Sequence, residues 1–396
     1  MTEANKQFQV LVLNNVSLNG LKRLGERFSC AKEAANPDAI LLRSADLHSV
    51  EIAGSVLAVG RAGSGTNNIP VAALSKRGVP VFNAPGANAN AVKELVLAGM
   101  LMAARNIGGA VKFVSALDPA DPEMEKKVEG GKKTYAGYEI AGHTLGVIGL
   151  GKIGCLVADA AIKLGMNVIG FDPEITVDAA WSLPAQVRKA NSLAEVLKNS
   201  NFVTLHVPLI DATRNMINAA SVEQMKHGAV LLNFARNGVV DEAAVLAALD
   251  AKKLSAYVCD FPSASVNSHP HVIALPHLGA STREAEENCA IMVADQVRDY
   301  LLDGDIVNSV NFPGVVMPRE SAYRIAIANA NVPNMVGQIS TALAEAKLNI
   351  HNMVNKSKKD VAYTLVDVDS KVPKKVIDAI AKIEGVLAVR YLPRET

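Results

Sequence analysis

The segment GVIGLGKIG, residues 146–154, constrains the fold of this chain more than any other. It places Gly149, Gly151 and Gly154 in the G-x-G-x-x-G spacing, after an apolar run and before a helix-like segment that ends near Gly165. The first glycine allows a tight turn, the second lets the backbone approach a pyrophosphate, and the third packs the helix on the strand. The helix N-terminus attracts the phosphates. This pattern predicts a dinucleotide site in a Rossmann-type, doubly wound sheet, rather than a merely structural glycine turn.

An acidic residue follows the glycines at the expected spacing. Asp172 closes the next apolar run, MNVIGFD, where a carboxylate binds the ribose hydroxyls of a dinucleotide. The following PEITVD contains no Arg to receive a 2′-phosphate. We therefore expect NAD rather than NADP.

Composition and charge narrow the class of protein. The chain has 396 residues, of which 49% are hydrophobic and 20% charged, as in a globular protein of two or three domains. With 40 basic and 39 acidic residues, bulk charge favours neither a nucleic acid nor an anionic membrane. The start carries no signal-peptide pattern, and the apolar run 95–104 is shorter than the roughly 20 residues of a membrane span. The four cysteines form no C-x-x-C pair and indicate no metal site. We expect a cytoplasmic protein.

The order of apolar runs predicts three domains. Short runs near the N-terminus alternate with helix-like segments and indicate a small flavodoxin-like α/β unit. Six continuous apolar runs from Thr144 onward fit strands covered on both faces. Ser281 with Glu284 forms a capping-box pattern, and the helix that it opens would return the chain to the first unit. The predicted domains are a discontinuous substrate domain (1–92 and 284–312), an NAD domain (93–283) and a C-terminal domain (318–396).

The C-terminal segment reads β-α-β-β-α-β from Tyr323 to Leu392, after the Pro/Gly-marked stretch NFPGVVMPRE. This order predicts a ferredoxin-like α+β module. Its free sheet edges favour pairing with a second copy. A long helical pattern over 88–107, with Asn88 or Asn90 as N-cap, offers another self-complementary surface, so we expect a homodimer or homotetramer.

Arg236 and His277 are the candidate catalytic residues. Each follows an apolar run, and strand C-termini line the ligand crevice of a doubly wound sheet. An Arg fork suits a substrate carboxylate and the neighbouring carbonyl oxygen, and His suits proton exchange. The alternatives are a surface salt bridge for Arg236 and a strand-end cap for His277.

Two further cations end apolar runs near the N-terminus. Arg43 in LLRSAD and Arg61 in VGRAGSG are followed by small residues, Ser44 and Ser64, which let backbone N–H groups reach an anion. Together they predict a small anionic substrate.

GVIGLGKIG, FDP, HVPL, NFARNGVVDE and PHLGAST, in this order, resemble the D-isomer-specific 2-hydroxyacid dehydrogenases. With LLRS, GRAGSG and a C-terminal module similar to ACT domains, the chain most resembles the phosphoglycerate-oxidising branch. The resemblance implies NAD-dependent oxidation of 3-phospho-D-glycerate to 3-phosphohydroxypyruvate, the first step of L-serine biosynthesis. Another D-2-hydroxyacid substrate, or a non-catalytic NAD(H)-sensing protein, are the alternatives.

The resemblance also implies roles for individual residues. Arg236 would anchor the substrate carboxylate and C2 oxygen, while His277 exchanges the hydroxyl proton. Residues implied in cofactor binding are Gly149, Gly151, Lys152, Ile153, Gly154, Asp172, Val207, Phe234, Ala235, Arg236, Asp260, His277, Gly279 and Ala280. Residues implied in substrate binding are Arg43, Ser44, Arg61, Ser64, Asn88, Lys93 and Lys132, with Lys133 as the alternative to Lys132.

The chain departs from the family pattern at two positions. Relatives carry a Glu five residues after the Asp at 260, where it pairs with the histidine, but this chain has Ser265. We therefore expect the reductive rate to fall at a lower pH than in Glu-bearing relatives. Lys93 stands where many relatives have a small residue; it is either a cleft residue or a helix-surface lysine.

The C-terminal module contains three asparagines, Asn329, Asn331 and Asn349, at or near positions that bind serine in regulated relatives. One of these positions is commonly His but is Asn329 here. Two interpretations stay open: an L-serine effector site and a purely structural dimerisation module.

Overall fold

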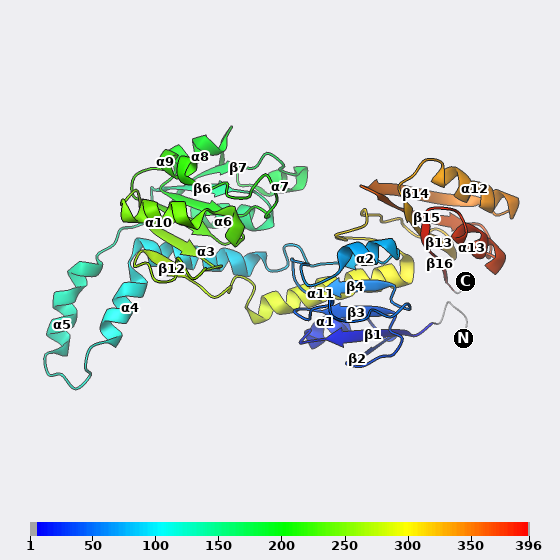
Figure 1. Ribbon diagram of the computed structural model, residues 1–396, viewed down its shortest axis with the longest axis horizontal. Coiled ribbons are helices and arrows are strands. Elements are labelled where there is room, and N and C mark those ends of the chain that lie inside the picture. The colour runs from blue at the N-terminus through cyan, green and yellow to red at the C-terminus, as the bar shows by residue number, and fades with distance from the viewer. Residues whose placement is uncertain (1–5, 395–396) are drawn as a thin grey trace. The chain divides into compact units, whose positions relative to one another are not determined.

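The computed structural model describes residues 6–394. The chain divides into two compact units, one holding the residues up to Asn88 and from Arg283 onward, the other holding Ala89–Thr282 (Figure 1). These divisions fall close to the predicted domain boundaries at 92/93 and 283/284. The C-terminal segment belongs to the first unit, because its sheet shares a core with the helix that begins at Arg283.

The first unit contains a five-stranded parallel sheet with strand order β2-β1-β3-β4-β5. This order is flavodoxin-like, as predicted. Its strands are β1 (Phe8–Leu13), β2 (Phe28–Ala31), β3 (Ala39–Leu42), β4 (Ala58–Arg61) and β5 (Val81–Phe82), and its helices are α1 (Leu18–Lys22), α2 (Val71–Lys76) and α11 (Arg283–Asp303). β2 was not predicted, because this edge strand has no buried residue and so lacks a continuous apolar run.

Helix α11 packs on this sheet through a fully buried stripe that includes Val293, Val297 and Leu301. A Cβ atom at Gly60 in β4 would lie 2.8 Å from Val293 Cγ2, so the close approach of helix and strand requires glycine there. The predicted cap at Ser281 lies one residue too early. α11 begins at Arg283, directly after Thr282, and the Ser281 hydroxyl donates to the His277 carbonyl at 3.4 Å.

The second unit is a seven-stranded parallel sheet with strand order β12-β11-β10-β9-β6-β7-β8. It extends the Rossmann order and confirms the predicted fold class. Its strands are β6 (Thr144–Ile148), β7 (Asn167–Phe171), β8 (Arg188–Lys189), β9 (Phe202–Leu205), β10 (Ala229–Asn233), β11 (Leu254–Cys259) and β12 (Val272–Ala274). Its helices are α3 (Ala89–Ala104), α4 (Ile107–Ser115), α5 (Met124–Gly131), η2 (Lys132–Tyr135), α6 (Lys152–Lys163), α7 (Val177–Ser182), α8 (Leu193–Asn199), α9 (Ala219–Gln224), η3 (Asn237–Val239) and α10 (Glu242–Asp250).

Helix α3 is buried against this sheet, with Val96 and Met100 fully enclosed. Helices α4 and α5 form an arm that extends away from the sheet of their own unit, and neither has a buried residue (Figure 1). Among the described helices, no single one is long and apolar enough to cross a membrane. Only α3 and α4 taken together, with a 71° bend between them, reach that length and composition.

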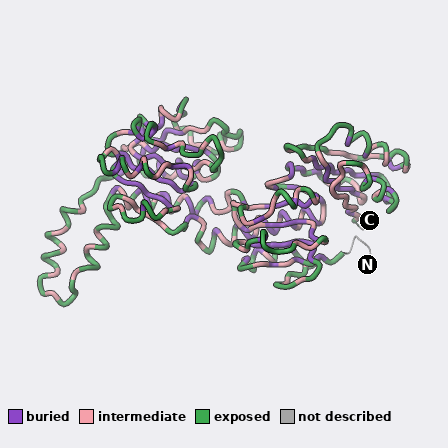
Figure 2. Tube along the Cα trace, viewed as in Figure 1, coloured by how far each residue is buried: buried purple, intermediate pink, exposed green. Residues whose placement is uncertain are grey.

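The C-terminal module is a four-stranded antiparallel sheet with strand order β14-β15-β13-β16. Its elements are β13 (Tyr323–Ala330), α12 (Met335–Glu345), β14 (Ile350–Lys358), β15 (Val361–Val368), α13 (Lys374–Ala381) and β16 (Val386–Pro393), the predicted ferredoxin-like sequence of elements. One face of the sheet packs on its own helices. The other face joins the core around α11 through residues that include Tyr363, Leu365 and Leu392, so the central strands β13 and β15 are buried on both sides (Figure 2).

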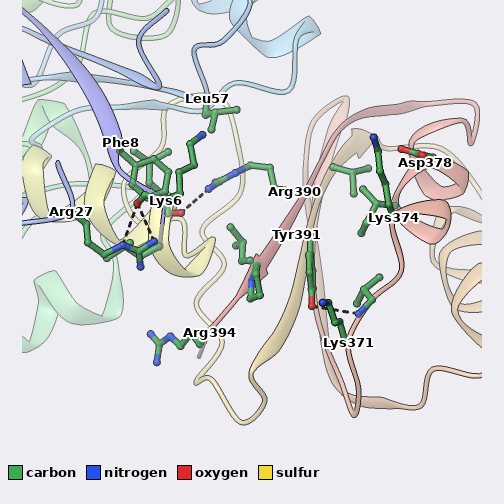
Figure 3. A pocket seen from close by; sticks show the side chains of 17 residues that line it. Lys6, Phe8, Arg27, Leu57, Lys371, Lys374, Asp378, Arg390, Tyr391 and Arg394 are labelled. Carbon is green, nitrogen blue, oxygen red and sulfur yellow. Dashed lines mark hydrogen bonds between the residues drawn. The ribbon is translucent and has the colours of Figure 1, made fainter. Parts of the chain in front are cut away.

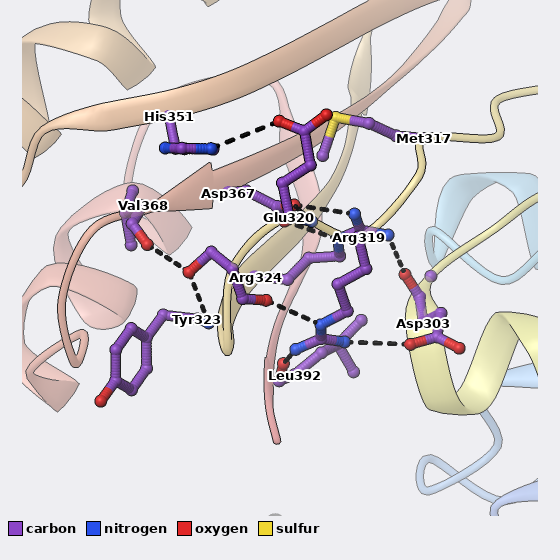
Figure 4. A network of polar contacts seen from close by, with 12 residues as sticks. Asp303, Met317, Arg319, Glu320, Tyr323, Arg324, His351, Asp367, Val368 and Leu392 are labelled. Atoms are coloured by element: carbon purple, nitrogen blue, oxygen red, sulfur yellow. Dashed lines mark hydrogen bonds and ion pairs between the residues drawn. The ribbon is translucent and has the colours of Figure 1, made fainter. Parts of the chain in front are cut away.

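A buried ion pair lies where the C-terminal module joins α11. Arg324 and Asp367 are both fully buried, and the guanidinium donates two hydrogen bonds to the carboxylate at 2.6 and 2.9 Å. Arg324 also donates to the Asp303 carbonyl at 3.1 Å, and Arg319 binds the Asp303 carboxylate at 3.1 Å (Figure 4). These contacts tie β13 and β15 to the end of α11.

We expect Asp367→Asn to destabilise the protein strongly, because it leaves the Arg324 charge buried without its anion. Removing one partner of a buried pair costs about 3–5 kcal/mol. Urea denaturation followed by circular dichroism measures this loss. Glu320→Gln is the control: it breaks an ion pair with His351 in which both side chains are about half exposed, and should cost less than about 1 kcal/mol. Equal losses in the two variants would contradict the expectation.

Candidate active site

The glycine turn after β6 has the steric requirements of a nucleotide loop. Gly149 has a φ of 90°, and a Cβ there would lie 2.7 Å from the His206 carbonyl oxygen. A Cβ at Gly154 would lie 2.0 Å from the Gly149 oxygen, so neither position accepts a side chain. A Cβ at Gly151, in contrast, would meet nothing within 4 Å. The second glycine thus faces open space, which is where a pyrophosphate would be held.

Helix α6 begins directly after this turn. Gly151 is its N-cap, no side chain caps its free N–H groups, and its first turn contains no acidic residue. Lys152 is exposed and Ile153 half-buried in that turn. The free amides and the helix dipole therefore favour an anion here.

Asp172 directly follows β7 and holds the turn from the other side. Its Oδ2 accepts a hydrogen bond from the Leu150 amide at 2.8 Å, and its Oδ1 accepts one from the Glu174 amide at 2.9 Å. Each carboxylate oxygen keeps a free lone pair for a ribose hydroxyl. The residues present therefore fit NAD.

His206 is a residue of this region that the sequence analysis missed. It follows β9 in HVPL, beside Val207, and its Nε2 lies 3.0 Å from Thr204 Oγ1. Burial lowers the pKa of His206 to about 3, so the imidazole is neutral at physiological pH. Its Nδ1 is shielded from solvent and has no hydrogen-bond partner within residues 6–394. Its place directly after an apolar strand-like run is the sequence feature from which His206 could have been predicted as a site residue.

Phe261 brings the two candidate catalytic residues together. The Arg236 Cζ lies 5.6 Å from the centre of the Phe261 ring, and the His277 ring centre lies 4.5 Å from it. Arg236 and His277 are themselves exposed, on the loops after β10 and β12. Phe234 and Ala235 lie buried before Arg236. One aromatic ring therefore contacts both the guanidinium and the imidazole.

Asp260 fixes the backbone around His277. The carboxylate is almost fully buried and accepts hydrogen bonds from the Leu278 amide at 2.7 Å and the Gly279 amide at 2.8 Å. His277 has a φ of 55°, a left-handed conformation that these bonds stabilise. Burial raises the pKa of Asp260, while the two amides and the nearby imidazole oppose this shift. Asp260 thus acts on His277 and on the turn up to Ala280 through the main chain.

Ser265, which stands where the family pattern has a Glu, lies beside a carboxylate from a different part of the chain. Ser265 Oγ is 2.7 Å from Ser263 Oγ and 3.5 Å from Glu242 Oε2, and Ser263 also donates to that oxygen. Glu242 is the first residue of α10. Its Oε1 is buried and has no hydrogen-bond partner in the described part of the chain. A carboxylate therefore stands next to Ser265, supplied by a different element.

In the first unit, the structure places Arg43 and Arg61 close to each other. Arg61 pairs in register with Leu42, the residue before Arg43, on the neighbouring strand. Both arginines lower the pKa of the buried Cys289, although burial raises it more strongly. Arg43 forms an ion pair with Glu286 of α11 at 2.5 Å. Ser44 and Ser64 are exposed beside them.

The other candidate substrate residues stand at the boundary between the two units or within the second unit. Asn88 directly precedes α3, as an N-cap would. Lys93, on the first turns of α3, donates to Asn90 at 2.6 Å and lies 3.9 Å from Glu94. Lys132 is exposed in the arm and pairs with Glu129 one turn away, as is typical of a solvated helix face. Lys133 neighbours it on η2.

The structure does not bring the three candidate effector residues together within one chain. Asn329 and Asn331 lie at the end of β13, opposite Ala362 of β15, whereas Asn349 precedes β14, whose first residue pairs with Val368. Six residues of strand separate these ends, roughly 20 Å. Asn329 is buried and its Oδ1 has no hydrogen-bond partner among the described residues.

Comparison with known proteins identifies the family. The model "D-isomer specific 2-hydroxyacid dehydrogenase, NAD binding domain" matches residues 97–279. The D-3-phosphoglycerate dehydrogenase of Haemophilus influenzae is 34% identical over 355 residues, which cover 87% of this chain and 83% of the relative. The chain belongs to the D-isomer specific 2-hydroxyacid dehydrogenase family. The chain is therefore an NAD-dependent oxidoreductase, which confirms the prediction of NAD as cofactor.

A further relative matches almost the full length of this chain, and solved structures match most of it. The D-3-phosphoglycerate dehydrogenase of Dictyostelium discoideum is 29% identical over 98% of this chain and 97% of its own length. Among solved structures, the D-2-hydroxyisocaproate dehydrogenase has a TM-score of 0.64 at 21% identity, covering 77% of this chain and all of that one. The NAD⁺-bound 3-phosphoglycerate dehydrogenase of Entamoeba histolytica has a TM-score of 0.59 at 22% identity, covering 77% of this chain and 99% of that one. These structures share the fold.

We expect Phe261→Leu to lower kcat roughly five- to thirtyfold, because it removes two ring contacts each worth about 0.5–1 kcal/mol. Leucine keeps the position apolar, so the loop should still fold. Steady-state kinetics measure the change, and NADH affinity, which depends on the Gly149–Gly154 turn, serves as the control and should be unaltered. An unchanged kcat would show that the ring does not position Arg236 and His277.

Proposed function

We propose that this enzyme oxidises 3-phospho-D-glycerate to 3-phosphohydroxypyruvate with NAD, the first step of L-serine biosynthesis. The observation that carries the proposal is the similarity to D-3-phosphoglycerate dehydrogenases, at 32–34% identity over 87% of the chain for those of Escherichia coli and Haemophilus influenzae. The neighbouring Arg43 and Arg61 support a substrate with more negative charge than a single carboxylate supplies.

The proposed chemistry assigns one task to each side chain. Arg236 binds the substrate carboxylate and the C2 oxygen through its planar fork of N–H donors. His277, neutral before the reaction, accepts the proton of the C2 hydroxyl. Bound NAD supplies the acceptor for the C2 hydride. In the reverse direction the imidazolium returns the proton to the carbonyl oxygen. Asp260 keeps His277 in place through the Leu278 and Gly279 amides.

Binding residues complete the proposal. The Gly149–Gly154 turn and Asp172 hold the pyrophosphate and the adenine-side ribose. Val207, Phe234, Ala235, Gly279 and Ala280 are assigned to the nicotinamide half by their match to the family pattern. Arg43, Arg61 and Ser64 are assigned to the substrate's anionic groups on the same basis. For Lys132, the exposed ion pair with Glu129 favours the surface interpretation. The Lys93 side chain is only 20% exposed, so it is not a fully solvated helix-surface lysine.

The substrate can be tested at Arg61. Arg61→Ala should lower kcat/KM for 3-phosphohydroxypyruvate roughly ten- to hundredfold, since a hydrogen bond to a charged group contributes about 1.5–3 kcal/mol. Hydroxypyruvate, which lacks the phosphate, should lose far less. NADH fluorescence decay measures both rates, and Lys76→Ala, at an exposed lysine of α2, is the control.

Equal losses for the two substrates would favour another D-2-hydroxyacid. Constant NADH fluorescence with every ketoacid would favour the non-catalytic NAD(H)-sensing alternative. Either result would overturn the proposed substrate.

The departure at Ser265 gives a prediction about pH. Reduction needs the charged imidazolium, and a neighbouring carboxylate favours that form. Ser265→Glu should therefore move the alkaline fall of the reductive rate to higher pH. Ser265→Gln has the same size without the charge and should leave the profile in place. A profile that Ser265→Glu does not move would mean that another carboxylate, such as the adjacent Glu242, already acts on His277.

We further propose a cytoplasmic homodimer or homotetramer. Exposed apolar residues on α4, with Ile107 at 40%, Val111 at 59% and Val114 at 42% exposure, support burial by another subunit. L-serine remains the proposed effector of the ACT-like module. Because Asn349 lies at the opposite end of the sheet from Asn329 and Asn331, a site that uses all three needs a second copy of the module.

A further inference from the structure

A large cavity lies within the first unit, between the edge of its parallel sheet and the C-terminal module (Figure 3). Its volume is about 970 Å³. Lys6, Phe8 and Arg27 line one side, at the start of β1 and just before β2, and residues in and just before α13 and in β16 line the other. The cavity is large enough for a small organic ligand. It belongs to a different unit from the Gly149–Gly154 turn, so it is not part of the dinucleotide site.

The lining of this cavity is strongly basic. One acidic residue, Asp378, contributes to it. The cationic residues that line it are Lys6, Arg27, Lys371, Lys374, Arg390 and Arg394. The chain as a whole is almost neutral, with a formal charge of +1, so this concentration of cations is local. Like charges brought together repel each other, and a bound anion would relieve that repulsion.

Ion pairs neutralise only part of this charge. Lys6 binds Asp38 at 2.5 Å, and Arg394 binds Asp303 at 2.6 Å. Arg27 donates to the Lys6 carbonyl, a neutral acceptor that leaves the positive charge in place. Within residues 6–394, neither Lys371 nor Lys374 forms an ion pair with a carboxylate. Counting Asp38, Asp303 and Asp378 against the six cations leaves an excess of three positive charges.

Arg390 is held rigidly at the centre of the lining. Its guanidinium donates to the carbonyls of Tyr300 at 3.0 Å and Leu301 at 2.7 Å, and lies 4.7 Å from the centre of the Tyr300 ring. These contacts fix the side chain without neutralising it, so an incoming anion meets a charge that is already ordered. Figure 3 shows Arg390 extending from the C-terminal module toward Lys6 and Arg27.

Lys371 and Lys374 flank the N-terminus of α13. Pro373 is the N-cap and provides no side-chain hydrogen bond, and the first turn contains no acidic residue. The helix dipole therefore adds to the positive potential of the two lysines. Leu57, Leu301 and Ile377 form apolar parts of the wall, which strengthen the interaction by excluding water.

We propose that this cavity binds a small, multiply charged phosphate compound, with Lys371, Lys374 and Arg390 on one side and Arg27 on the other. Phosphate matches the lining because arginine forks bind it in two-pronged fashion and lysines bind it as point charges. Such a ligand would contact both the parallel-sheet domain and the C-terminal module, and would stabilise their contact. A binder of the folded state raises the free energy of unfolding.

Inorganic pyrophosphate is the probe, titrated into the full chain by calorimetry with saturating NADH to fill the dinucleotide site. The double variant Lys371→Gln with Lys374→Gln should bind it at least tenfold more weakly than the unmodified chain. Lys375→Gln is the matched control, because this exposed lysine neighbours Lys374 on α13 but does not line the cavity. In thermal unfolding, pyrophosphate should raise the Tm of the unmodified chain and of Lys375→Gln, and raise that of the double variant less.

Equal affinity in all three proteins, or no binding to the unmodified chain, would overturn the proposal. Citrate is the comparison for a carboxylate polyanion, and equal or tighter binding of citrate at these lysines would overturn the assignment to phosphate. None of the substituted lysines belongs to the proposed catalytic machinery. The double variant should therefore keep its NADH-dependent activity, so failure here is distinguishable from failure of the proposed dehydrogenase reaction.

Discussion

The packing of α11 is the interaction on which the first unit depends. Its buried stripe closes the parallel sheet across Gly60, where only a glycine lets helix and strand approach. The same helix places Glu286 beside Arg43 at one end, and at its other end offers the Tyr300 and Leu301 carbonyls to Arg390. The two anion-binding regions proposed for this unit are thus positioned by opposite ends of one helix.

In the second unit, a buried carboxylate holds the backbone around the histidine. His277 adopts a left-handed conformation that the buried Asp260 carboxylate stabilises through two amides. The Phe261 ring then joins the imidazole to the Arg236 guanidinium. A carboxylate therefore fixes the loop of His277, although the position expected for a direct partner is Ser265.

Charge is distributed unevenly although its sum is close to zero. Arg43 and Arg61 lie together at the C-terminal ends of β3 and β4, and the cavity near β16 collects an excess of three cations. Arg324, in contrast, is completely neutralised by its buried pair with Asp367. Paired charges of this kind join the C-terminal module to α11, whereas the excess of cations around the cavity is what we propose to meet an anion.

Sequence alone determined the fold class, the NAD cofactor and the candidate residues around Gly149, Arg236 and His277, because these depend on local patterns: glycine spacing, continuous apolar runs and strand ends. It failed for β2, which has no buried residue and no apolar run, and for the start of α11, which begins at Arg283 and not directly after Ser281. Only the tertiary structure placed Glu242 beside Ser265, Phe261 between Arg236 and His277, and Lys6 across a cavity from Lys374. These pairs are distant in the sequence or depend on side-chain direction, and packing rather than local propensity decides which of them meet.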